Sequence, residues 1–259
     1  MAQRIKLLLS HLQFLRHLVK IDIQLRYHGT FFGFFWTMLN AFAMITIFTF
    51  VFGYVLKVPL PRFPVFLFCG YLPWLFFSSC MINSCFSILK SATLVRKIYF
   101  PRETLVIAEI VSQFLVYLSS FAVFLLCFSL TGWLNVSWEL LPLLPLLFIC
   151  LFLLSLGFGF LLSLINVFFR DVAYFVEVLI TIWFYMSPIF YPLEWVPERV
   201  QFLVRTNPIT SIIEAFRAIF YGGTYNLWHL WYPGILSVVI FLLGYRIFLL
   251  YEQQIVEEL

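Results

Sequence analysis

The chain alternates between long stretches without charge and short segments that hold its charged residues. A helix needs about 20 apolar residues to cross a bilayer core about 30 Å thick. The uncharged stretches meet that length and predict six membrane-spanning helices, at residues 31–56, 63–89, 104–131, 140–169, 172–191 and 227–250. The predicted fold class is therefore an all-α membrane protein with both termini on one side of the membrane.

Residues 1–30 follow a different pattern. Apolar side chains recur at steps of three and four, and polar or charged side chains occupy the opposite face, as in an amphipathic helix. The apolar face consists of Leu8, Leu12, Leu15, Val19 and Ile23. No apolar core of a cleaved signal peptide precedes the first span. We expect an interfacial helix in the cytoplasmic leaflet, ahead of a single membrane domain over residues 31–259. It could be an orientation anchor or take part in receiving a substrate.

The segment 194–223 is amphipathic and charged, so we expect that it does not cross the membrane. Pro197 and Pro208 can each occupy the first turn of a short helix, and Asn207 can cap the second one. Gly222 can terminate that second helix. The pattern predicts two short re-entrant helices in the outer leaflet, which would need a protein or water-filled surface beside them.

Composition supports lipid as the main solvent of the chain. Hydrophobic residues make up 63%, charged residues 11%, and the mean hydropathy is +1.01. Cytoplasmic segments of membrane proteins are enriched in lysine and arginine. On one predicted side lie Arg4, Lys6, Arg16, Lys20, Arg26, Lys90, Arg96, Lys97, Arg102, Arg170 and Arg246; on the other lie Lys57, Arg62, Arg199, Arg205 and Arg217. The termini are therefore predicted to be cytoplasmic, and this asymmetry explains the net charge of +4 without a nucleic-acid partner.

Enzyme chemistry finds little support in the sequence. The two aspartates, Asp22 and Asp171, are too far apart for a metal-diphosphate motif, and no Gly-Lys pair is present for a phosphate-binding loop. The cysteines have no metal-ligand or paired spacing and are expected to be apolar fillers within the spans. We expect a conduit with no catalytic residue, metal or cofactor of its own.

Ion-coupled transport would need ionisable groups deep in the membrane. Glu109 and Glu177 are the candidates, and each lies a turn or two from a cytoplasmic helix end. Snorkelling, or a pair with an arginine of another subunit, would cost less there than a proton relay. An ion-coupled carrier and an enzyme that modifies polyprenyl-linked sugars remain open alternatives.

The loop at about 90–103 combines cations with apolar side chains and is closed by a proline. Ile98, Tyr99 and Phe100 stand beside Arg96 and Lys97, a pattern that suits docking into the groove of a partner protein. If energy is not generated in this chain, we expect it to arrive through this loop.

Several segments together resemble one known family. They read Arg26-Tyr27-His28-Gly29-Thr30-Phe31-Phe32-Gly33-Phe34-Phe35-Trp36, Gly70-Tyr71-Leu72-Pro73-Trp74, Phe100-Pro101-Arg102, Asn166-Val167-Phe168-Phe169-Arg170-Asp171, Ser187-Pro188-Ile189 and Asn207-Pro208. In this order they resemble the type-2 permeases of ABC transporters that export lipid-linked bacterial polysaccharides such as O antigens, capsules and teichoic acids. The resemblance covers nearly the whole chain.

This resemblance implies a half-transporter in the bacterial inner membrane. Two copies would form the pore, and two copies of a separate nucleotide-binding subunit, which holds ATP and magnesium, would bind beneath it. The cargo would be an undecaprenyl-diphosphate-linked polysaccharide, with O antigen as the first expectation; a drug or small-lipid exporter of the same superfamily is the nearest alternative. The coupling residues would be Arg96, Lys97, Ile98, Tyr99, Phe100, Pro101 and Arg102.

Aromatic residues make up 21% of the chain, and aromatic faces can stack on sugar rings without requiring one hydrogen-bond pattern. By resemblance, we expect a polymer channel along the first and fifth spans with Trp36, Trp183 and Tyr185. The carrier diphosphate would meet Arg26 and Arg170, although positive-inside anchoring explains both cations equally well. The residues expected at the outward gate are Trp195, Asn207, Pro208 and Phe216.

Overall fold

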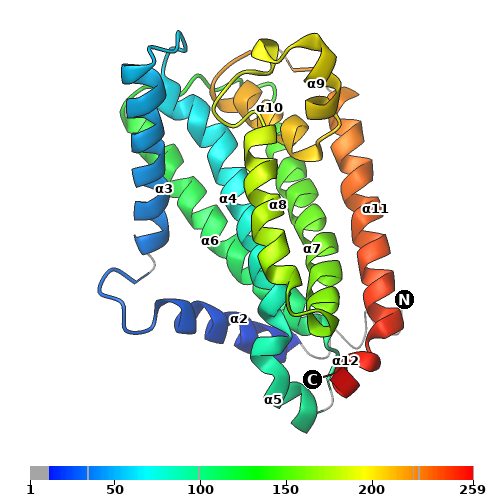
Figure 1. The fold of residues 1–259 in the computed structure, drawn as a ribbon. Coiled ribbons are helices and arrows are strands. Elements are labelled where there is room, and N and C mark those ends of the chain that lie inside the picture. The colour runs from blue at the N-terminus through cyan, green and yellow to red at the C-terminus, as the bar shows by residue number, and fades with distance from the viewer. Residues whose placement is uncertain (1–11, 34, 99, 224, 227, 259) are drawn as a thin grey trace.

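The computed structural model describes residues 12–258 except 34, 99, 224 and 227, and it is helical with no strand among the described residues. Long helices run side by side from one end of the molecule to the other (Figure 1). The elements are α2 (Leu12–Tyr27), α3 (Phe35–Phe48), η1 (Thr49–Val55), α4 (Phe63–Ser87), η2 (Leu89–Ser91), α5 (Ala92–Lys97), α6 (Glu103–Leu130), η3 (Leu141–Leu143), α7 (Leu144–Phe168), α8 (Val172–Met186), η4 (Leu193–Trp195), α9 (Glu198–Arg205), α10 (Pro208–Phe220), α11 (Trp228–Tyr251) and α12 (Gln254–Glu258).

Five helical segments of the described chain are long and apolar enough to cross a membrane. They are Phe35–Val55, Phe63–Lys97, Glu103–Leu130, Leu141–Phe168 and Trp228–Tyr251. They coincide with five of the six predicted spans and confirm an all-helical, multi-pass membrane protein. The other predicted span, 172–191, is shorter than expected because α8 ends at Met186. Ser187 is extended, as expected for a residue that precedes a proline.

The first span also begins later than predicted. The sequence pattern placed its start at residue 31, whereas α3 starts at Phe35. Gly29 and Gly33 both have positive φ angles, of 74° and 51°, in the turn that joins α2 to α3. Glycine adopts this conformation at little cost, so the turn can separate the interfacial helix from the span.

Helix α4 forms the centre of the bundle. It packs against α6, α7, α8 and α10, and most of its side chains are buried. Helix α11 packs mainly against α7, where two glycines allow close approach. A Cβ atom on Gly157 would lie 2.6 Å from the backbone carbon of Ile240, so no larger residue fits this crossing. Small residues play this role between membrane helices generally.

Helix α2 runs across the end of the bundle, crosswise to the long helices (Figure 1). The predicted amphipathic helix is thus observed over Leu12–Tyr27, while its first part, with Leu8, lies outside the described residues. Its apolar side is only partly covered, and Val19 is its one buried residue. It packs on α6.

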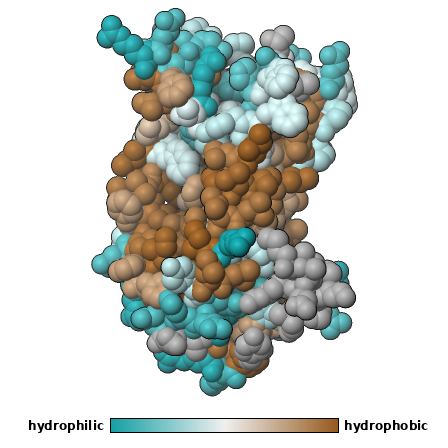
Figure 2. Space-filling model, turned by 90° about the vertical axis from the view of Figure 1, so that its right-hand side faces the viewer, coloured by the Kyte–Doolittle hydropathy of each residue, from teal (hydrophilic) through white to brown (hydrophobic). Residues whose placement is uncertain are grey.

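The surface has the distribution expected of a membrane protein. On the side of the molecule that includes α11, a hydrophobic band separates two more hydrophilic ends (Figure 2). Large apolar side chains are exposed along α3, α8 and α11, and they include Phe42, Phe175 and Leu243. One cysteine departs from the prediction of buried fillers, because Cys127 is exposed while the other four are buried.

Candidate functional site

The predicted coupling loop divides into an anchored half and an exposed half. Phe100 and Pro101 are buried, whereas Arg96, Lys97 and Ile98 are exposed. Tyr99 lies outside the described residues. The exposed half surrounds the C-terminus of α5, which projects beyond the end of the bundle (Figure 1). A partner could therefore contact the cations without unpacking the loop.

Phe100 anchors the loop to the interfacial helix. Its ring centre lies 5.1 Å from that of Phe14 of α2, edge to face. Val95, Phe100 and Leu105 form a small buried cluster against which Phe14 and Leu18 pack. Arg102 is half-buried and donates to the backbone carbonyl of Glu252, just before α12. The loop, α2 and the C-terminal segment thus meet at one end of the molecule.

A second set of contacts joins α2 to α6 through charged side chains. The Arg26 guanidinium lies 2.8 Å from a carboxylate oxygen of Asp22 and 2.9 Å from one of Glu109. Ser112 donates to Asp22, and the Gln113 amide donates to Glu109 over 3.2 Å. Burial disfavours the charged form of Arg26, but the two carboxylates outweigh it and raise the pKa of the guanidinium. Arg26 is therefore a fully charged structural partner of α6.

This cluster corrects one expectation for Glu109. The sequence suggested snorkelling or a pair with an arginine of another subunit, whereas Glu109 is buried and pairs with Arg26 of its own chain. Periodicity could not reveal this pair, since 83 residues separate the two side chains. Glu177, in contrast, is exposed on α8.

The three predicted channel aromatics occupy different environments. Trp183 is half-buried against α4, with its ring centre 5.2 Å from that of Phe77. Tyr185 and Trp36 are 63% and 47% exposed. Within the described part of the chain, no ring contact joins Trp36 to Trp183 or Tyr185. The helices α3 and α8 approach each other at Phe48 and Phe184, whose ring centres are 6.3 Å apart.

Arg170 lies exposed in the turn between α7 and α8. Asn166 holds this turn: its amide donates to the carbonyl of Cys85 over 2.8 Å, and its oxygen accepts from the backbone nitrogen of Ala173 over 3.1 Å. The turn is thereby fixed to α4, while the Arg170 side chain remains accessible. Of the two cations predicted to meet a diphosphate, Arg170 is thus the exposed one and Arg26 the paired one.

The two predicted outward helices are observed as α9 and α10. Pro208 is the first residue of α10, and the Asn207 side chain caps it by accepting from the nitrogen of Ile209 over 3.1 Å. Pro197 precedes α9 instead of occupying its first turn. Phe216 and Pro208 are buried in the bundle, whereas Trp195, in η4, is 49% exposed. The four predicted gate residues therefore do not form one surface.

A buried arginine that the sequence did not single out organises this outward end. Arg217 of α10 pairs with Glu214 over 2.9 Å, donates to the carbonyl of Ile189 over 2.8 Å, and lies 3.6 Å above the ring centre of Phe66. Gly70 leaves the space for it, since a Cβ there would lie 3.3 Å from the guanidinium. The spacing of Glu214 and Arg217 within an apolar helix was the available signal, but the sequence placed Arg217 only among the cations of the non-cytoplasmic side.

A cavity of about 550 Å³ lies between α2, α3, α4 and α6. Its lining residues are Arg26, Tyr27, Trp36, Thr37, Leu39, Asn40, Ala43, Leu75, Ser79, Gln113 and Val116. A smaller recess of about 30 Å³ adjoins it deeper between α4 and α6 and shares Thr37, Ser79 and Gln113 with it. Among the described residues, no group of His, Cys, Asp and Glu could hold a metal ion.

Known proteins resemble the chain over most of its length. An O-antigen export system permease protein RfbA of Klebsiella pneumoniae is 31% identical over 225 residues, with 85% of each chain covered. A protein of the same name from Myxococcus xanthus is 30% identical over 207 residues, covering 79% of this chain and 78% of the relative. The polysialic acid transport protein KpsM of Escherichia coli is 25% identical over 209 residues, with 76% of each chain covered.

The family match is equally extensive. Residues 13–221 match the ABC-2 type transporter family, so the matched region runs from α2 through the end of α10. This is the family that the sequence motifs had indicated. The chain belongs to the ABC-2 type transporter family.

Proposed function

We propose that the chain is the transmembrane subunit of an ATP-driven exporter that moves an undecaprenyl-diphosphate-linked polysaccharide, O antigen in the first instance, from the cytoplasm to the periplasm. The observation that carries this proposal is the similarity to O-antigen export permeases over 85% of both chains. ATP and magnesium would be bound by a separate nucleotide-binding subunit, because the sequence has no phosphate-binding loop of its own.

The coupling segment supports the need for such a partner. Arg96, Lys97 and Ile98 are exposed at one end of the bundle, while Phe100 ties the same segment to α2. A partner that moves Arg96 and Lys97 would therefore also move α2. We propose that the nucleotide-binding subunit docks here, with residues 96–102 transmitting its closure.

A homodimer would cover the exposed apolar helices. Helix α3 is the least buried of the five candidate spans. On α8, large side chains such as Phe175, Ile182 and Tyr185 are exposed on one side, while Val176 and Ile180 pack inward. We propose that two copies face each other along α3 and α8 and enclose a polymer channel that includes Trp36, Trp183 and Tyr185.

Six crossings remain our proposal for the topology. Helix α8 has 15 residues, or about 22 Å of helix, so it needs the extended residues after Met186 to reach the outer leaflet. The short helices α9 and α10 would then turn back at that surface as gate helices. The domain division of 1–30 and 31–259 follows the boundary between α2 and α3.

The bacterial inner membrane is the proposed location, with both termini cytoplasmic. Helices α2, α5 and α12 lie together at one end of the molecule, and α9 and α10 lie at the other (Figure 1). The first end has most of the lysines and arginines, as cytoplasmic surfaces do. Arg170 faces solvent in the α7–α8 turn at this end and is our first choice for binding the carrier diphosphate. Arg26 could bind the diphosphate only by giving up its carboxylate partners.

The contacts of Glu109 favour a structural role over ion coupling. Its carboxylate pairs with Arg26 and accepts a hydrogen bond from Gln113 of the same chain. A drug or small-lipid exporter would share the coupling segment and differ in cargo. The choice between polysaccharide and small cargo therefore depends on a transport assay.

The test is reconstitution of the chain with its nucleotide-binding subunit in lipid nanodiscs, followed by ATPase and polymer-transport measurements. We expect ATP hydrolysis that depends on the complex and that is lost or uncoupled in an Arg96→Ala, Lys97→Ala, Ile98→Ala variant. These positions are exposed, so the variant should still fold. Transport of a small amphiphile but not of lipid-linked polymer would contradict the assignment of polysaccharide as the cargo. Failure to form any complex would contradict the permease role.

A further inference from the structure

The cavity between α2, α3, α4 and α6 has a mainly apolar lining with several uncharged polar groups and one charged residue, Arg26. Thr37, Asn40, Ser79 and Gln113 contribute hydroxyl and amide groups, and Trp36 supplies an exposed aromatic ring. Ligand pockets typically combine apolar and aromatic walls with a few polar groups that fix orientation. A volume of about 550 Å³ lies within the range of small-ligand sites.

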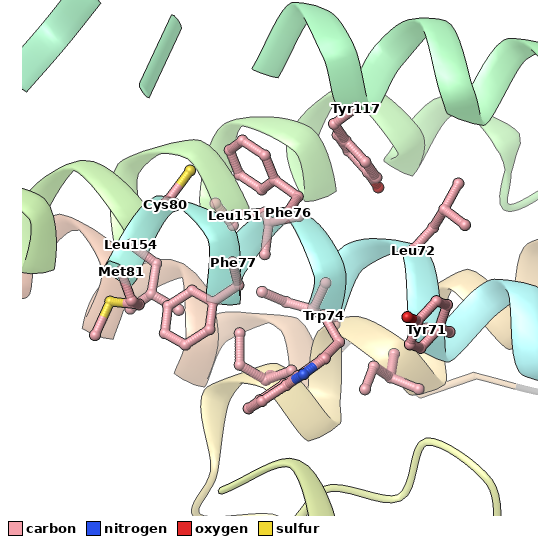
Figure 3. Packing of buried hydrophobic residues seen from close by; sticks show 14 of the residues in the cluster. Tyr71, Leu72, Trp74, Phe76, Phe77, Cys80, Met81, Tyr117, Leu151 and Leu154 are labelled. Carbon is pink, nitrogen blue, oxygen red and sulfur yellow. The ribbon is translucent and has the colours of Figure 1, made fainter. Parts of the chain in front are cut away.

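Tyr117 lines the small recess that adjoins this cavity and has an unsatisfied hydroxyl group. Its side chain reaches from α6 toward α4, where Phe76 and Leu72 lie beside it (Figure 3). The residue is 4% exposed, and its hydroxyl oxygen has no hydrogen-bond partner among the described residues. A buried hydroxyl without a partner destabilises the protein, and a ligand group that bonds it would remove this cost. The recess beside it, of about 30 Å³, admits one hydroxyl group or one water.

The charges around the cavity argue against an anionic ligand. Arg26 is the charged residue that lines it, and both Asp22 and Glu109 bond to that guanidinium. Lys90 lies 4.0 Å from Glu109, so the cluster as a whole has no excess of positive charge. A phosphate would have to displace a carboxylate, whereas an uncharged polyhydroxyl group would not.

An apolar groove begins on the same turn of α3. A second cavity, of about 400 Å³, is lined by Phe32, Phe35, Met38, Leu39, Phe42, Val123, Phe124 and Cys127. Leu39 lines both cavities, so polar and apolar surfaces adjoin within one turn of a helix that borders the lipid. A ligand that fits both parts has an uncharged, hydroxyl-rich head and a hydrocarbon chain.

We propose that this composite cavity within one subunit binds a lipid with an uncharged glycosyl headgroup, with the head beside Tyr117 and the chain in the apolar groove. The site shares Trp36 with the channel proposed along α3 and α8, but its other lining residues lie on α2, α3, α4 and α6 of the same subunit. The inference goes beyond the proposed function, because an uncharged glycolipid is not the diphosphate-linked cargo proposed above.

The probe is dodecyl maltoside with a photoreactive diazirine in its chain, applied below its micelle concentration to the full chain in phosphatidylcholine nanodiscs. We expect labelling of peptides from α3, α4 and α6 that unlabelled dodecyl maltoside competes away and dodecyl phosphate does not. Tyr117→Phe removes only the hydroxyl and should weaken binding by about three- to tenfold, the usual effect of one hydrogen bond. The unliganded variant should melt at the same or a higher temperature, because the unsatisfied hydroxyl is gone.

Ser84→Ala is the matched control. The Ser84 hydroxyl is also buried without a partner among the described residues, but it lines neither cavity. Its removal should leave labelling unchanged. The proposal would be wrong if Tyr117→Phe bound the maltoside probe with wild-type affinity. It would also be wrong if dodecyl phosphate competed with the probe as well as unlabelled dodecyl maltoside does. Polymer transport by the reconstituted complex is measured separately, so loss of this site and loss of the permease role are distinguishable.

Discussion

The guanidinium of Arg26 lies 2.9 Å from the carboxylate of Glu109, and this ion pair ties the interfacial helix to the third span. Asp22 completes the cluster from one turn earlier on α2. The other end of α2 is held by the contact of Phe14 with Phe100. Helix α2 is therefore fixed at two points, one on the predicted coupling segment and one on α6.

Glu109→Gln should destabilise the protein and uncouple it. Removing one partner of a buried ion pair costs about 3–5 kcal/mol, and Asp22 will retain part of the interaction with Arg26. We expect a lower melting temperature and ATP hydrolysis that no longer drives transport. The double variant Glu109→Gln, Arg26→Gln should lose less than the sum of the two single variants, because each removes the same contact. Strictly additive losses would show that the pair is not coupled.

The two halves of the coupling segment should respond differently to substitution. Phe100→Ala should cost about 3–5 kcal/mol of folding free energy, since a buried phenylalanine is lost from a small cluster. Ile98→Ala should leave the melting temperature nearly unchanged, because exposed positions usually contribute within about 0.5 kcal/mol. Co-purification of the nucleotide-binding subunit should fall with Ile98→Ala despite intact folding. A stable variant that still binds its partner at wild-type level would remove Ile98 from the interface.

Gly70→Ala should disturb the outward end. The added Cβ would lie 3.1 Å from the carbonyl oxygen of Ile189 and 3.3 Å from the Arg217 guanidinium. Overpacking of this kind costs about 1–3 kcal/mol, against about 1 kcal/mol gained from replacing glycine in a helix. We expect a net loss of thermal stability and altered polymer release. Gly234→Ala in α11 is the control, since the added Cβ would lie 4.0 Å from the sulfur of Cys150, an ordinary contact.

The channel proposal is best tested at Tyr185. Its side chain is exposed in a single subunit, so Tyr185→Ala should keep the subunit folded and reduce the rate of polymer transport. Tyr185→Phe should retain most of that rate if the aromatic face is what contacts sugar rings. Trp183→Ala is unsuitable, because Trp183 packs against Trp74 and Phe77 and its loss would damage the core. Transport by Tyr185→Ala at the wild-type rate would exclude Tyr185 from the channel.

Local features of the chain were predictable from its sequence because they depend on neighbouring residues. Five helices long and apolar enough to span a membrane, the amphipathic helix and the α10 cap at Asn207 follow from apolar run length, helical periodicity and proline position, and each is observed. The family followed from short motifs in a fixed order and is confirmed. The shorter α8 shows the limit of run length, since Pro188 ends the helix while the sequence remains apolar.

Tertiary packing decided which of the candidate residues meet. Arg26 and Arg170 look alike as cations beside a membrane, but α6 supplies a buried carboxylate to the first, while the second stays in solvent. The sequence placed Arg217 only among the cations of the non-cytoplasmic side, and the structure shows it buried between Phe66, Glu214 and Ile189. The unsatisfied Tyr117 hydroxyl and the cavity beside it depend on how α3, α4 and α6 cross. Periodicity and composition report what each segment prefers by itself, whereas the burial and pairing of a charge depend on partners far away in sequence, which only the folded chain brings together.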